Sequence, residues 1–453
     1  MLINFSVENF RSIGGEQTLN LVASKGQKGH EDHCVPIAKT DERVLRTSVV
    51  YGANAAGKSN LVRAMEFAQD LIVHGPGPKQ RIALSQFRFT DAAERPSSFE
   101  FRFLVGDQVF VYGFDVTPEE VVEEWLSATS ENGRETDVFH RKGKEITFGN
   151  LKKFGQDGTT SADALKALEL LGTRPNQLLL NKIVDLDDER RGTLLDRVVQ
   201  WFAVRLTVIG PSSNFGPLLE HLDDDPDFKR FTAEFLANVG TGIGGIEIEQ
   251  AEIDADKLPR ELVESLESSE GGESSPFSIV GAGMTLSLHP DDSSKMIRRN
   301  LSAKHDVDGS SFSLPFDEES DGTRRFLHLL PALYYLTHSP KVFVIDELDR
   351  SLHSLLSHAL LKFFVEVCPG ANQQLIVTTH ETHLLDLDLL RRDEIWFVEK
   401  DDRQQTRLFS LADLKVRKDL RIEKSYLQGR FGGVPFIGGA DKLKDLVNCP
   451  TGL

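Results

Sequence analysis

The segment GANAAGKS at residues 52–59 places two glycines, a lysine and a serine in the order G-x-x-x-x-G-K-[ST]. Glycines at these positions let backbone N–H groups curl around an anion, and a helix that begins there adds its partial positive charge. Lys58 would then reach the β- and γ-phosphates of a nucleotide, and the hydroxyl of Ser59 would bind Mg²⁺. A Gly-rich turn would match the whole pattern by accident in about one chain of this length in sixty. We therefore expect ATP and Mg²⁺ to bind here.

The flanking sequence supplies the context that such a loop requires. VLRTSVVY before it ends in an apolar, β-branched run that predicts a buried strand, and SNLVRAMEFAQDLIV after it has the apolar spacing of a helix. The loop therefore joins a strand to a helix. The residues expected to contact the nucleotide here are Gly52, Asn54, Ala55, Ala56, Gly57, Lys58, Ser59 and Asn60.

A pair of acids follows a second apolar strand, in KVFVIDELDRSLH at residues 341–353. This is the Walker-B arrangement, in which Asp346 at the end of the strand holds Mg²⁺ and Glu347 orients or deprotonates the attacking water. A strand that ends in two acids is common, so the flanking segments decide the interpretation. LIVTTHETHLL after it predicts a buried strand that ends at His380, and PFDEESDGTRRFLHLLPAL before it predicts an amphipathic helix that opens with serine and glycine, a second anion site.

Composition limits what surrounds these motifs. The chain has 453 residues, 40% hydrophobic and 27% charged, which is typical of a globular protein with two or three domains. The formal net charge of −18 argues against a general nucleic-acid coat, but it allows a local basic groove and leaves DNA open as a partner. Three separated cysteines without a C-x-x-C pattern indicate a reducing cytoplasmic location. No apolar run approaches the roughly 18 residues of a membrane helix, so we expect no membrane partner.

The remaining pattern predicts a mixed architecture. Alternating runs at the start of the chain and again in FEFRFLV, VFVYGFDV, VVEEWLSA and DVFHRKGKEITFG predict a hairpin and an antiparallel meander. Apolar residues then recur three and four apart from about residue 161 to 239, which predicts a helical insert. Strand-like segments resume at MTLSLHPD and at residues 312–316. The acidic, Ser/Gly-rich residues 261–276 predict a mobile surface loop without chemistry.

The order ENFRSI, GANAAGKS, ESDGTRR, VFVIDELD, TTHET resembles the ATP-binding-cassette (ABC) type ATPases of the chromosome-maintenance (SMC), double-strand-break-repair and RecF group. In that group the signature segment of one subunit caps the γ-phosphate held by the phosphate loop of another. The resemblance therefore implies a homo-oligomer with shared ATP sites. It assigns His380 to the switch histidine, catalytic together with Glu347, and Asp349 to the loop that crosses the interface. It assigns the signature to Ser320, Asp321, Gly322 and Thr323.

The segment ESDGT departs from the transporter-type LSGGQ, and no glutamine-loop residue can be placed, since Gln86 fits a solvated loop better. A closer resemblance is to compact ATPases of bacterial phage-defence operons, including RloA-like proteins and the ATPase subunit of the PARIS system. It lies in PSSFEFRF, VVEEWL, ESDGT and SYLQGRFGGVPF. Such ATPases work, in a toxin–antitoxin-like manner, with a separate effector, often a TOPRIM-type nuclease, and the resemblance also implies a phage trigger protein. Only 73 positions (453 − 380) follow His380, so we expect the effector to be another chain.

We therefore predict an α/β fold, an ABC-type P-loop ATPase head with an antiparallel β meander and a helical insert. Residues 1–160 would form the N-terminal ATPase half, 161–300 a mainly helical insert, and 301–453 the C-terminal half with a C-terminal arm. The expected function is an ATP-hydrolysing sensor and scaffold of an antiviral defence system that controls a separate nuclease. The alternatives are a RecF- or SMC-like DNA-repair ATPase and a self-contained nuclease.

Other candidate chemistry is weaker. Arg134 and His140 fit the R-x-x-x-x-x-H spacing of a ribonuclease family, but they fall on a predicted hairpin. His353, His358 and His383 are interpreted as polar or capping residues rather than metal ligands. A basic stretch near the C-terminus could face a partner, nucleic acid or solvent, and we favour a solvated face. It comprises Arg417, Lys418, Arg421, Lys424 and Arg430.

Overall fold

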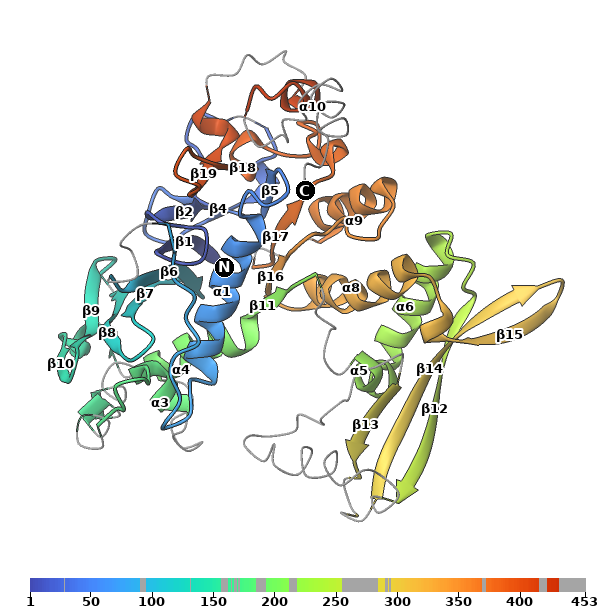
Figure 1. Ribbon diagram of the computed structural model, residues 1–453, viewed down its shortest axis with the longest axis horizontal. Coiled ribbons are helices and arrows are strands. Elements are labelled where there is room, and N and C mark those ends of the chain that lie inside the picture. The colour runs from blue at the N-terminus through green and yellow to red at the C-terminus, as the bar shows by residue number, and fades with distance from the viewer. Residues whose placement is uncertain are drawn as a thin grey trace, which may run out of the picture. The chain divides into compact units, whose positions relative to one another are not determined.

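The computed structural model divides the chain into two units (Figure 1). Unit 1 comprises Met1–Val208 and Leu375–Leu453, and unit 2 comprises Ile209–Gln374. The sequence of unit 2 is thus inserted between the two segments of unit 1. The described residues are 1–27, 29–89, 95–130, 132–155, 162–163, 165–166, 169, 172–184, 193–211, 218–254, 284–289, 292, 295–368, 372–414 and 422–431.

The larger sheet of unit 1 has seven strands, and each neighbouring pair is antiparallel. In sheet order they are β10 (Glu145–Phe148), β9 (Glu135–Lys142), β8 (Val121–Thr129), β7 (Gln108–Val116), β6 (Ser97–Val105), β1 (Leu2–Glu8) and β2 (Gln17–Asn20). Successive side chains of β6 point to opposite faces of this sheet. Phe101 and Phe103 are fully buried and their rings contact Trp201, whereas Glu100 and Arg102 are only half-buried. The predicted hairpin and meander are confirmed.

A second group of strands in unit 1 carries the phosphate loop. β17 (Gln374–Thr379) and β18 (Ile395–Lys400) pair in parallel with the two sides of β5 (Thr47–Gly52), and β19 (Thr406–Ser410) pairs antiparallel with β18. Every residue of β5 is buried, as its apolar, β-branched sequence predicts for a strand with two neighbours. The helix α1 (Lys58–Val73) follows β5 after the loop.

The remaining elements of unit 1 are short. The helices are α3 (Leu179–Val184), α4 (Leu194–Gln200), the π-helical turn η5 (Trp201–Arg205) and α10 (Ile422–Leu427). The 3₁₀ turns are η1 (Glu31–His33), η3 (Leu151–Phe154), η8 (Thr382–Leu384), η9 (Arg392–Glu394) and η10 (Leu411–Asp413). The strands β3 (Cys34–Pro36) and β4 (Arg43–Leu45) form a small antiparallel pair, and β11 (Leu206–Ile209) ends at the boundary of the unit.

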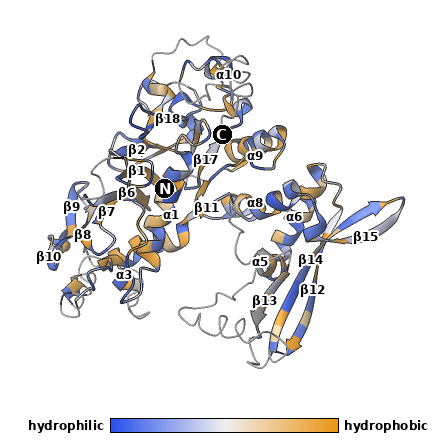
Figure 2. Ribbon diagram, in the orientation of Figure 1, coloured by the Kyte–Doolittle hydropathy of each residue, from blue (hydrophilic) through white to orange (hydrophobic). Residues whose placement is uncertain are grey.

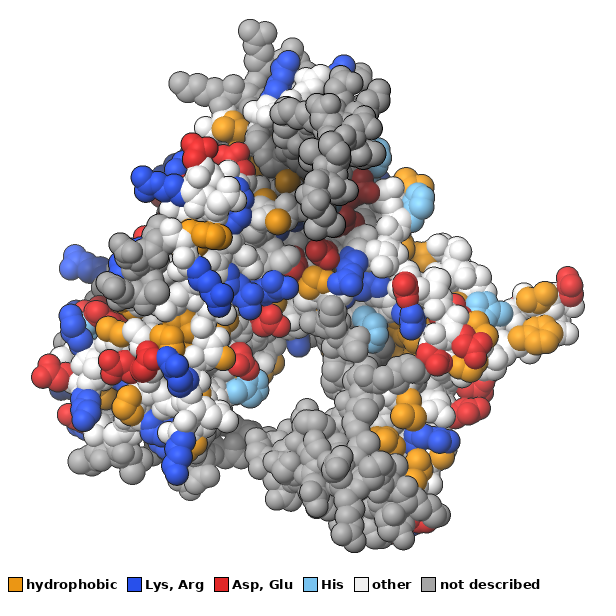
Figure 3. All heavy atoms as spheres, in the orientation of Figure 1, with side chains coloured by type: hydrophobic (Ala, Val, Ile, Leu, Met, Phe, Trp, Pro, Cys, Tyr) orange, Lys and Arg blue, Asp and Glu red, His pale blue; other side chains and the backbone are white. Residues whose placement is uncertain are grey.

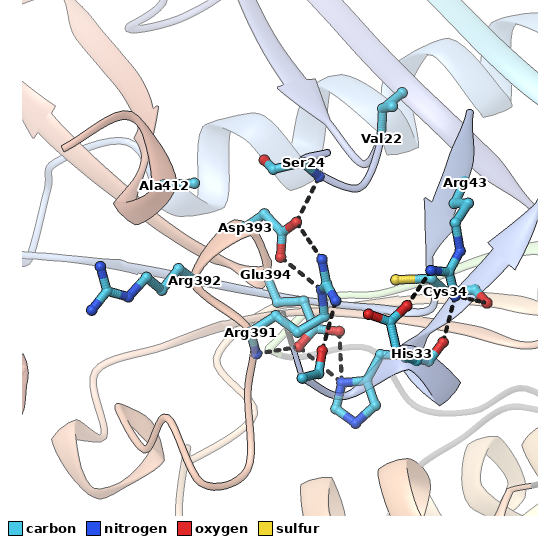
Figure 4. Close-up of polar contacts among 12 residues, drawn as sticks. Val22, Ser24, His33, Cys34, Arg43, Arg391, Arg392, Asp393, Glu394 and Ala412 are labelled. Carbon is cyan, nitrogen blue, oxygen red and sulfur yellow. Dashed lines mark hydrogen bonds and ion pairs between the residues drawn. The ribbon is translucent and has the colours of Figure 1, made fainter. Parts of the chain in front are cut away.

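A buried polar cluster ties the N-terminal part of unit 1 to the turn before β18 (Figure 4). The Nδ1 atom of His33 lies 2.9 Å and 3.0 Å from the two carboxylate oxygens of Glu394, which also accepts a 2.7 Å bond from the backbone N–H of Arg391. The guanidinium of Arg391 donates twice, at 2.9 Å, to Asp393, and Asp393 accepts a 2.7 Å bond from the backbone N–H of Ser24. Burial raises the pKa of Glu394, and the contact with His33 opposes that shift.

Unit 2 combines helices with a four-stranded antiparallel sheet in which β14 pairs with three strands. The strands are β12 (Gly245–Asp254), β13 (Met284–Leu288), β14 (Lys295–Val307) and β15 (Ser310–Pro315), and a further strand is β16 (Val342–Ile345). The helices are α5 (Leu218–Asp224), α6 (Pro226–Asn238), the 3₁₀ turn η7 (Phe316–Glu318), α8 (Asp321–His338) and α9 (Ser354–Val367). Apolar side chains at the exposed tip of β14 and β15 include Val307 and Phe312 (Figure 3).

The expectation of a mainly helical insert at residues 161–300 needs correction. Helices α4 and α6 lie where the spacing predicts them, but the chain forms strands from β12 onwards. The reason is local, because Ile246 and Ile248 alternate with glutamates in β12, a period of two that favours a strand (Figure 2). The acidic loop at residues 261–276 and five of the eleven positions of the predicted helix at residues 162–172 lie outside the described residues.

The predicted α/β class is confirmed. The segment with the phosphate-loop pattern joins a buried strand to a helix, and an antiparallel meander belongs to the same unit. Among the helices that the structure describes, none is long and apolar enough to cross a membrane.

Candidate ATP-binding site

The phosphate loop lies between β5 and α1 of unit 1. Asn54 and Ala55 are exposed, whereas Ala56, Gly57 and Lys58 are buried. Ala55 has a φ of 64° and Gly57 a φ of 119°, so the backbone adopts a positive φ at two positions just before α1 begins. A β-carbon at position 57 would lie 2.1 Å from the hydroxyl oxygen of Thr406, which makes glycine necessary there.

The side chain of Lys58 is folded against its own loop. Its Nζ donates to the carbonyl oxygens of Gly52 at 2.8 Å and Ala53 at 3.3 Å. It also lies 3.0 Å from Nε2 and 3.3 Å from Nδ1 of His380, the residue directly after β17. Register explains this contact, because β17 pairs in parallel with β5 and Thr379 is opposite Tyr51. The structure therefore brings two predicted site residues together, the lysine of the loop and the switch histidine.

The segment after the switch histidine is held by the C-terminal helix α10. Glu423 accepts a 3.3 Å hydrogen bond from the hydroxyl of Thr382 and lies 3.4 Å from Nδ1 of His383. On the same helix Tyr426 contacts the rings of Tyr51 and Phe397, and burial raises its pKa to about 12.

The predicted acids lie in unit 2, directly after β16. Asp346 is 1% exposed, and its backbone N–H donates a 2.8 Å bond to the carbonyl of Ile209. Glu347 has a φ of 51°, a conformation that non-glycine residues rarely adopt. The chain then tightens into a turn in which the N–H of Arg350 bonds to the carbonyl of Glu347 at 3.0 Å. Asp349 lies in this turn and is half-buried.

The signature residues open helix α8 of unit 2. Ser320 is the N-cap, and its hydroxyl accepts a 3.1 Å bond from the N–H of Thr323. Asp321 is the first residue of the helix, and its exposed side chain pairs with Arg324. Gly322 packs closely against the turn that follows Asp346 and Glu347, because a β-carbon at position 322 would lie 2.6 Å from the carbonyl oxygen of Ser351. Signature and acidic turn are therefore packed together within this unit.

Arg325 is a site residue that the sequence reasoning missed. It is 8% exposed, and its guanidinium donates to the carbonyl oxygens of Gly210 at 3.3 Å and Asp346 at 3.4 Å. Burial lowers the pKa of Arg325, and Arg350 adds to this effect, while Asp346 and Glu347 oppose it. The side chain thus ties α8 to the end of β16. The signal in the sequence was the second arginine of ESDGTRR.

The donor chemistry suits Mg²⁺. Each unit carries an oxygen donor of the kind that this ion prefers, the hydroxyl of Ser59 at the start of α1 in unit 1 and the buried carboxylate of Asp346 in unit 2, and Mg²⁺ keeps several waters in nucleotide sites. No group of three or more His, Cys, Asp or Glu side chains that could hold a metal occurs within the described parts of the chain. The residues fit an ion that also binds the phosphates of a nucleotide.

The weaker candidates lie where structure alone explains them. Gln86 donates a 2.7 Å bond to the carbonyl of Arg95, so its amide makes a hydrogen bond to the backbone. His140 is on β9 and lies 2.7 Å from a carboxylate oxygen of Glu123. His353 caps α9 by accepting a 3.2 Å bond from the N–H of Leu355. In the basic C-terminal stretch, positions 417, 418 and 421 lie outside the described residues.

The sequence at residues 48–386 matches the family described as "AAA domain, putative AbiEii toxin, Type IV TA system". The chain belongs to this family. The matched residues include the G-x-x-x-x-G-K-[ST] segment and the residues predicted as the signature, the acids after β16 and the switch histidine, so the protein is a P-loop ATPase of the AAA family.

Solved structures similar to this chain include two SMC heads. The SMC head domain from Thermotoga maritima is 10% identical, with 92% of this chain and 99% of that chain covered and a TM-score of 0.39. The Smc head domain with an extended coiled coil bound to the C-terminal domain of ScpA, derived from Pyrococcus furiosus, is 13% identical, with 95% and 98% covered and a TM-score of 0.38. No curated protein matches the sequence.

Proposed function

We propose that the protein binds and hydrolyses ATP at the phosphate loop. The observation that carries this proposal is the placement of Lys58, the first residue of α1. Its buried ammonium contacts carbonyl oxygens of the loop and the ring of His380. A phosphate would replace those carbonyls as the partner of the ammonium and gain the N–H groups at the start of α1.

The roles of the other residues follow from their chemistry. The nucleotide contacts come from the phosphate loop, residues 52–60, and Ser59 with Asp346 would hold Mg²⁺, which neutralises charge on the phosphates. Glu347 accepts the proton of the attacking water, and His380 donates a hydrogen bond to the γ-phosphate. In a second copy of the chain, the signature at residues 320–323 would cap that phosphate and Asp349 would lie in the interface.

The test of nucleotide binding is the Lys58→Ala variant, measured by equilibrium binding of a fluorescent ATP analogue. We expect affinity to fall at least about 100-fold, since the charged hydrogen bonds to two phosphates are lost. Circular dichroism checks that the variant is folded. Wild-type affinity in a folded variant would show that the loop is not the nucleotide site.

Sharing of the site between copies needs a variant that keeps α8 intact. Gly322 is unsuitable, because any side chain there meets the carbonyl of Ser351. Thr323→Glu is better, because a glutamate three residues after the N-cap Ser320 forms a capping box and retains the helix start. Its carboxylate would repel the γ-phosphate of a neighbouring copy. Thr323→Gln is the matched control, with the same shape and no charge.

We expect Thr323→Glu to lower ATPase turnover at least about tenfold through like-charge repulsion, and Thr323→Gln to be near wild type. Mixing Thr323→Glu with Lys58→Ala protein should restore activity, because one site then combines two intact halves. Normal hydrolysis by Thr323→Glu, or no recovery when subunits demonstrably exchange, would exclude a shared site.

We further propose that this ATPase is the sensor and scaffold of a bacterial antiviral system and controls a separate effector, such as a TOPRIM-type nuclease, upon a phage trigger. The family description, which names a toxin–antitoxin system, supports this class of role.

Purification of the tagged protein from infected and uninfected cells carrying its neighbouring genes tests the proposal. We expect the effector to co-purify with ATPase-competent protein from uninfected cells and to be released on infection. ATPase activity that rises several-fold with DNA alone, without any protein partner, would instead favour a DNA-repair ATPase, and nucleic-acid cleavage by this chain alone would favour a nuclease.

A further inference from the structure

Four polar side chains form a continuous hydrogen-bonded line behind the phosphate loop of unit 1. Thr406 on β19 lies at its centre, with its hydroxyl 3.0 Å from the carbonyl oxygen of Ala56 in the loop. The hydroxyl of Ser12, between β1 and β2, lies 2.7 Å from that of Thr406, and the amide of Asn60 on α1 donates to Ser12 at 2.7 Å. Lys400 on β18 donates to Thr406 at 3.2 Å.

The direction of every bond in this line is determined. The carbonyl of Ala56 can only accept, so the single hydroxyl proton of Thr406 is committed to it. Because that proton is used on Ala56, the contact between Ser12 and Thr406 must be a donation from Ser12, and Lys400, which can only donate, also donates to the Thr406 oxygen. Ser12 is then free to accept from the Asn60 amide, as its distance indicates. Thr406, 3% exposed, uses its one proton and accepts two hydrogen bonds.

This arrangement fixes the orientation of one peptide plane in the loop. Because a trans peptide is planar, the carbonyl of Ala56 and the N–H of Gly57 point in opposite directions. The bond from Thr406 therefore turns the N–H of Gly57 away from β19, to the opposite side of the loop. The same closeness explains why residue 57 is a glycine, since a β-carbon would meet three atoms of Thr406 within 3.0 Å.

We propose that Thr406 is a positioning residue of the phosphate loop, which orients the Gly57 N–H for a phosphate oxygen and is itself oriented by Ser12 and Lys400. This inference rests on the proposed ATP-binding function. Thr406 acts through the loop and does not touch the nucleotide. Its hydroxyl, rather than its bulk, is the part that matters.

The test compares Thr406→Val, which keeps the shape and removes the hydroxyl, with Thr406→Ser, which keeps the hydroxyl. The matched control uses Ser6 and Thr18, whose hydroxyls also lie 2.7 Å apart, on β1 and β2 of the same unit. Thr18→Val removes a comparable bond at a place that the loop does not contact. The measurements are the dissociation constant for ATP, kcat and KM for hydrolysis, and the thermal midpoint of each variant.

We expect Thr406→Val to raise the dissociation constant and KM about tenfold, equivalent to about 1.4 kcal/mol, and to leave kcat at saturating ATP within about twofold. Thr406→Ser and Thr18→Val should bind ATP as the wild type does. Should Thr406→Val not fold, Ser12→Ala carries the test, with an expected loss of about threefold in affinity against no change in Ser6→Ala.

The failures are distinguishable. Wild-type protein that binds no ATP, or Lys58→Ala protein that binds it normally, would refute the proposed function. Wild-type protein that binds ATP, together with folded Thr406→Val or Ser12→Ala protein of unchanged affinity, would refute the positioning role alone. Equal losses in Thr406→Ser and Thr406→Val would also refute it, because the effect would then follow packing and not the hydroxyl.

Discussion

Acid should weaken helix α8, which begins with the signature residues, through the titration of His328. Burial lowers the pKa of His328 from 6.5 to about 4, and the nearby charges of Arg325 and Arg324 lower it further in the same direction. Its Nδ1 atom is buried and has no hydrogen-bond partner among the described residues. The folded protein therefore holds this imidazole neutral at pH values where the unfolded chain would protonate it.

The sign and size of the effect follow from that difference. Because the pKa is lowered on folding, the stabilisation is complete above pH 6.5 and is lost as the pH falls from 6.5 towards 4. At about 1.4 kcal/mol for each pH unit, the full interval corresponds to about 3 kcal/mol. The variant His328→Phe keeps a ring of similar size and removes the titration. It should match the wild type within about 1 kcal/mol at pH 7.5 and exceed its stability by about 2 kcal/mol at pH 4.5.

Unit 2 contains none of the tryptophans of the chain, which are Trp125, Trp201 and Trp396, so its stability needs another probe. Hydrogen exchange of peptides covering Asp321–His338, corrected for the intrinsic rate at each pH, reports the opening of α8. In parallel, NMR of ¹³C-labelled histidine gives the pKa directly, and the signal missing from His328→Phe provides the assignment. A measured pKa between 6 and 7, or equal acid sensitivity in both proteins, would refute the reasoning.

Three further predictions concern unit 1 and the acids. Glu347→Gln should bind ATP but turn over at least ~100-fold more slowly, because the base for water is lost, and an unchanged steady-state rate would show that Glu347 is not catalytic. His380→Ala should lower kcat at least about tenfold with little change in ATP affinity, whereas His140→Ala on β9 should retain wild-type turnover. Glu394→Ala should lower the free energy of unfolding by about 3 kcal/mol or more, because the buried His33 ring and the Arg391 N–H lose their hydrogen-bond partner. Urea unfolding followed by tryptophan fluorescence measures this loss. Glu119→Ala, which removes an exposed pair with Arg81, should cost less than about 1 kcal/mol, and equal losses would contradict the special role of the buried cluster.

The sequence predicted the elements whose cause is local. The phosphate loop with β5 and α1, the meander and the helices α4 and α6 all follow from glycine placement or hydrophobic period, and the structure confirms them. The contact of Lys58 with His380 was not predicted, although the resemblance assigned both residues to the ATP site, because no local pattern links a loop to a residue that follows a distant strand.

The unpredicted features depend on contacts between distant segments. The hydroxyls of Ser12 and Thr406 meet across 394 positions, and neither residue stands in a motif that marks it. Arg325 bonds to the carbonyl oxygen of Asp346 because the end of β16 lies beside α8 within unit 2, which no local pattern predicts. Strand β12 was not predicted for a different reason, because its alternating pattern has few apolar residues and follows a helical stretch.

The insertion of unit 2 into the sequence of unit 1 has a consequence for synthesis on the ribosome. Strand β5 is fully buried, and its partner residues Tyr51 and Thr379 are 328 positions apart (379 − 51). At about 5 to 20 residues per second, β5 emerges roughly 20 to 60 seconds before β17 exists. During that interval an apolar strand with two unpaired edges is exposed, which is the kind of segment that chaperones bind and that aggregates when they do not. The nascent chain of this ATPase should therefore depend on holding chaperones until β17 and β18 have been made.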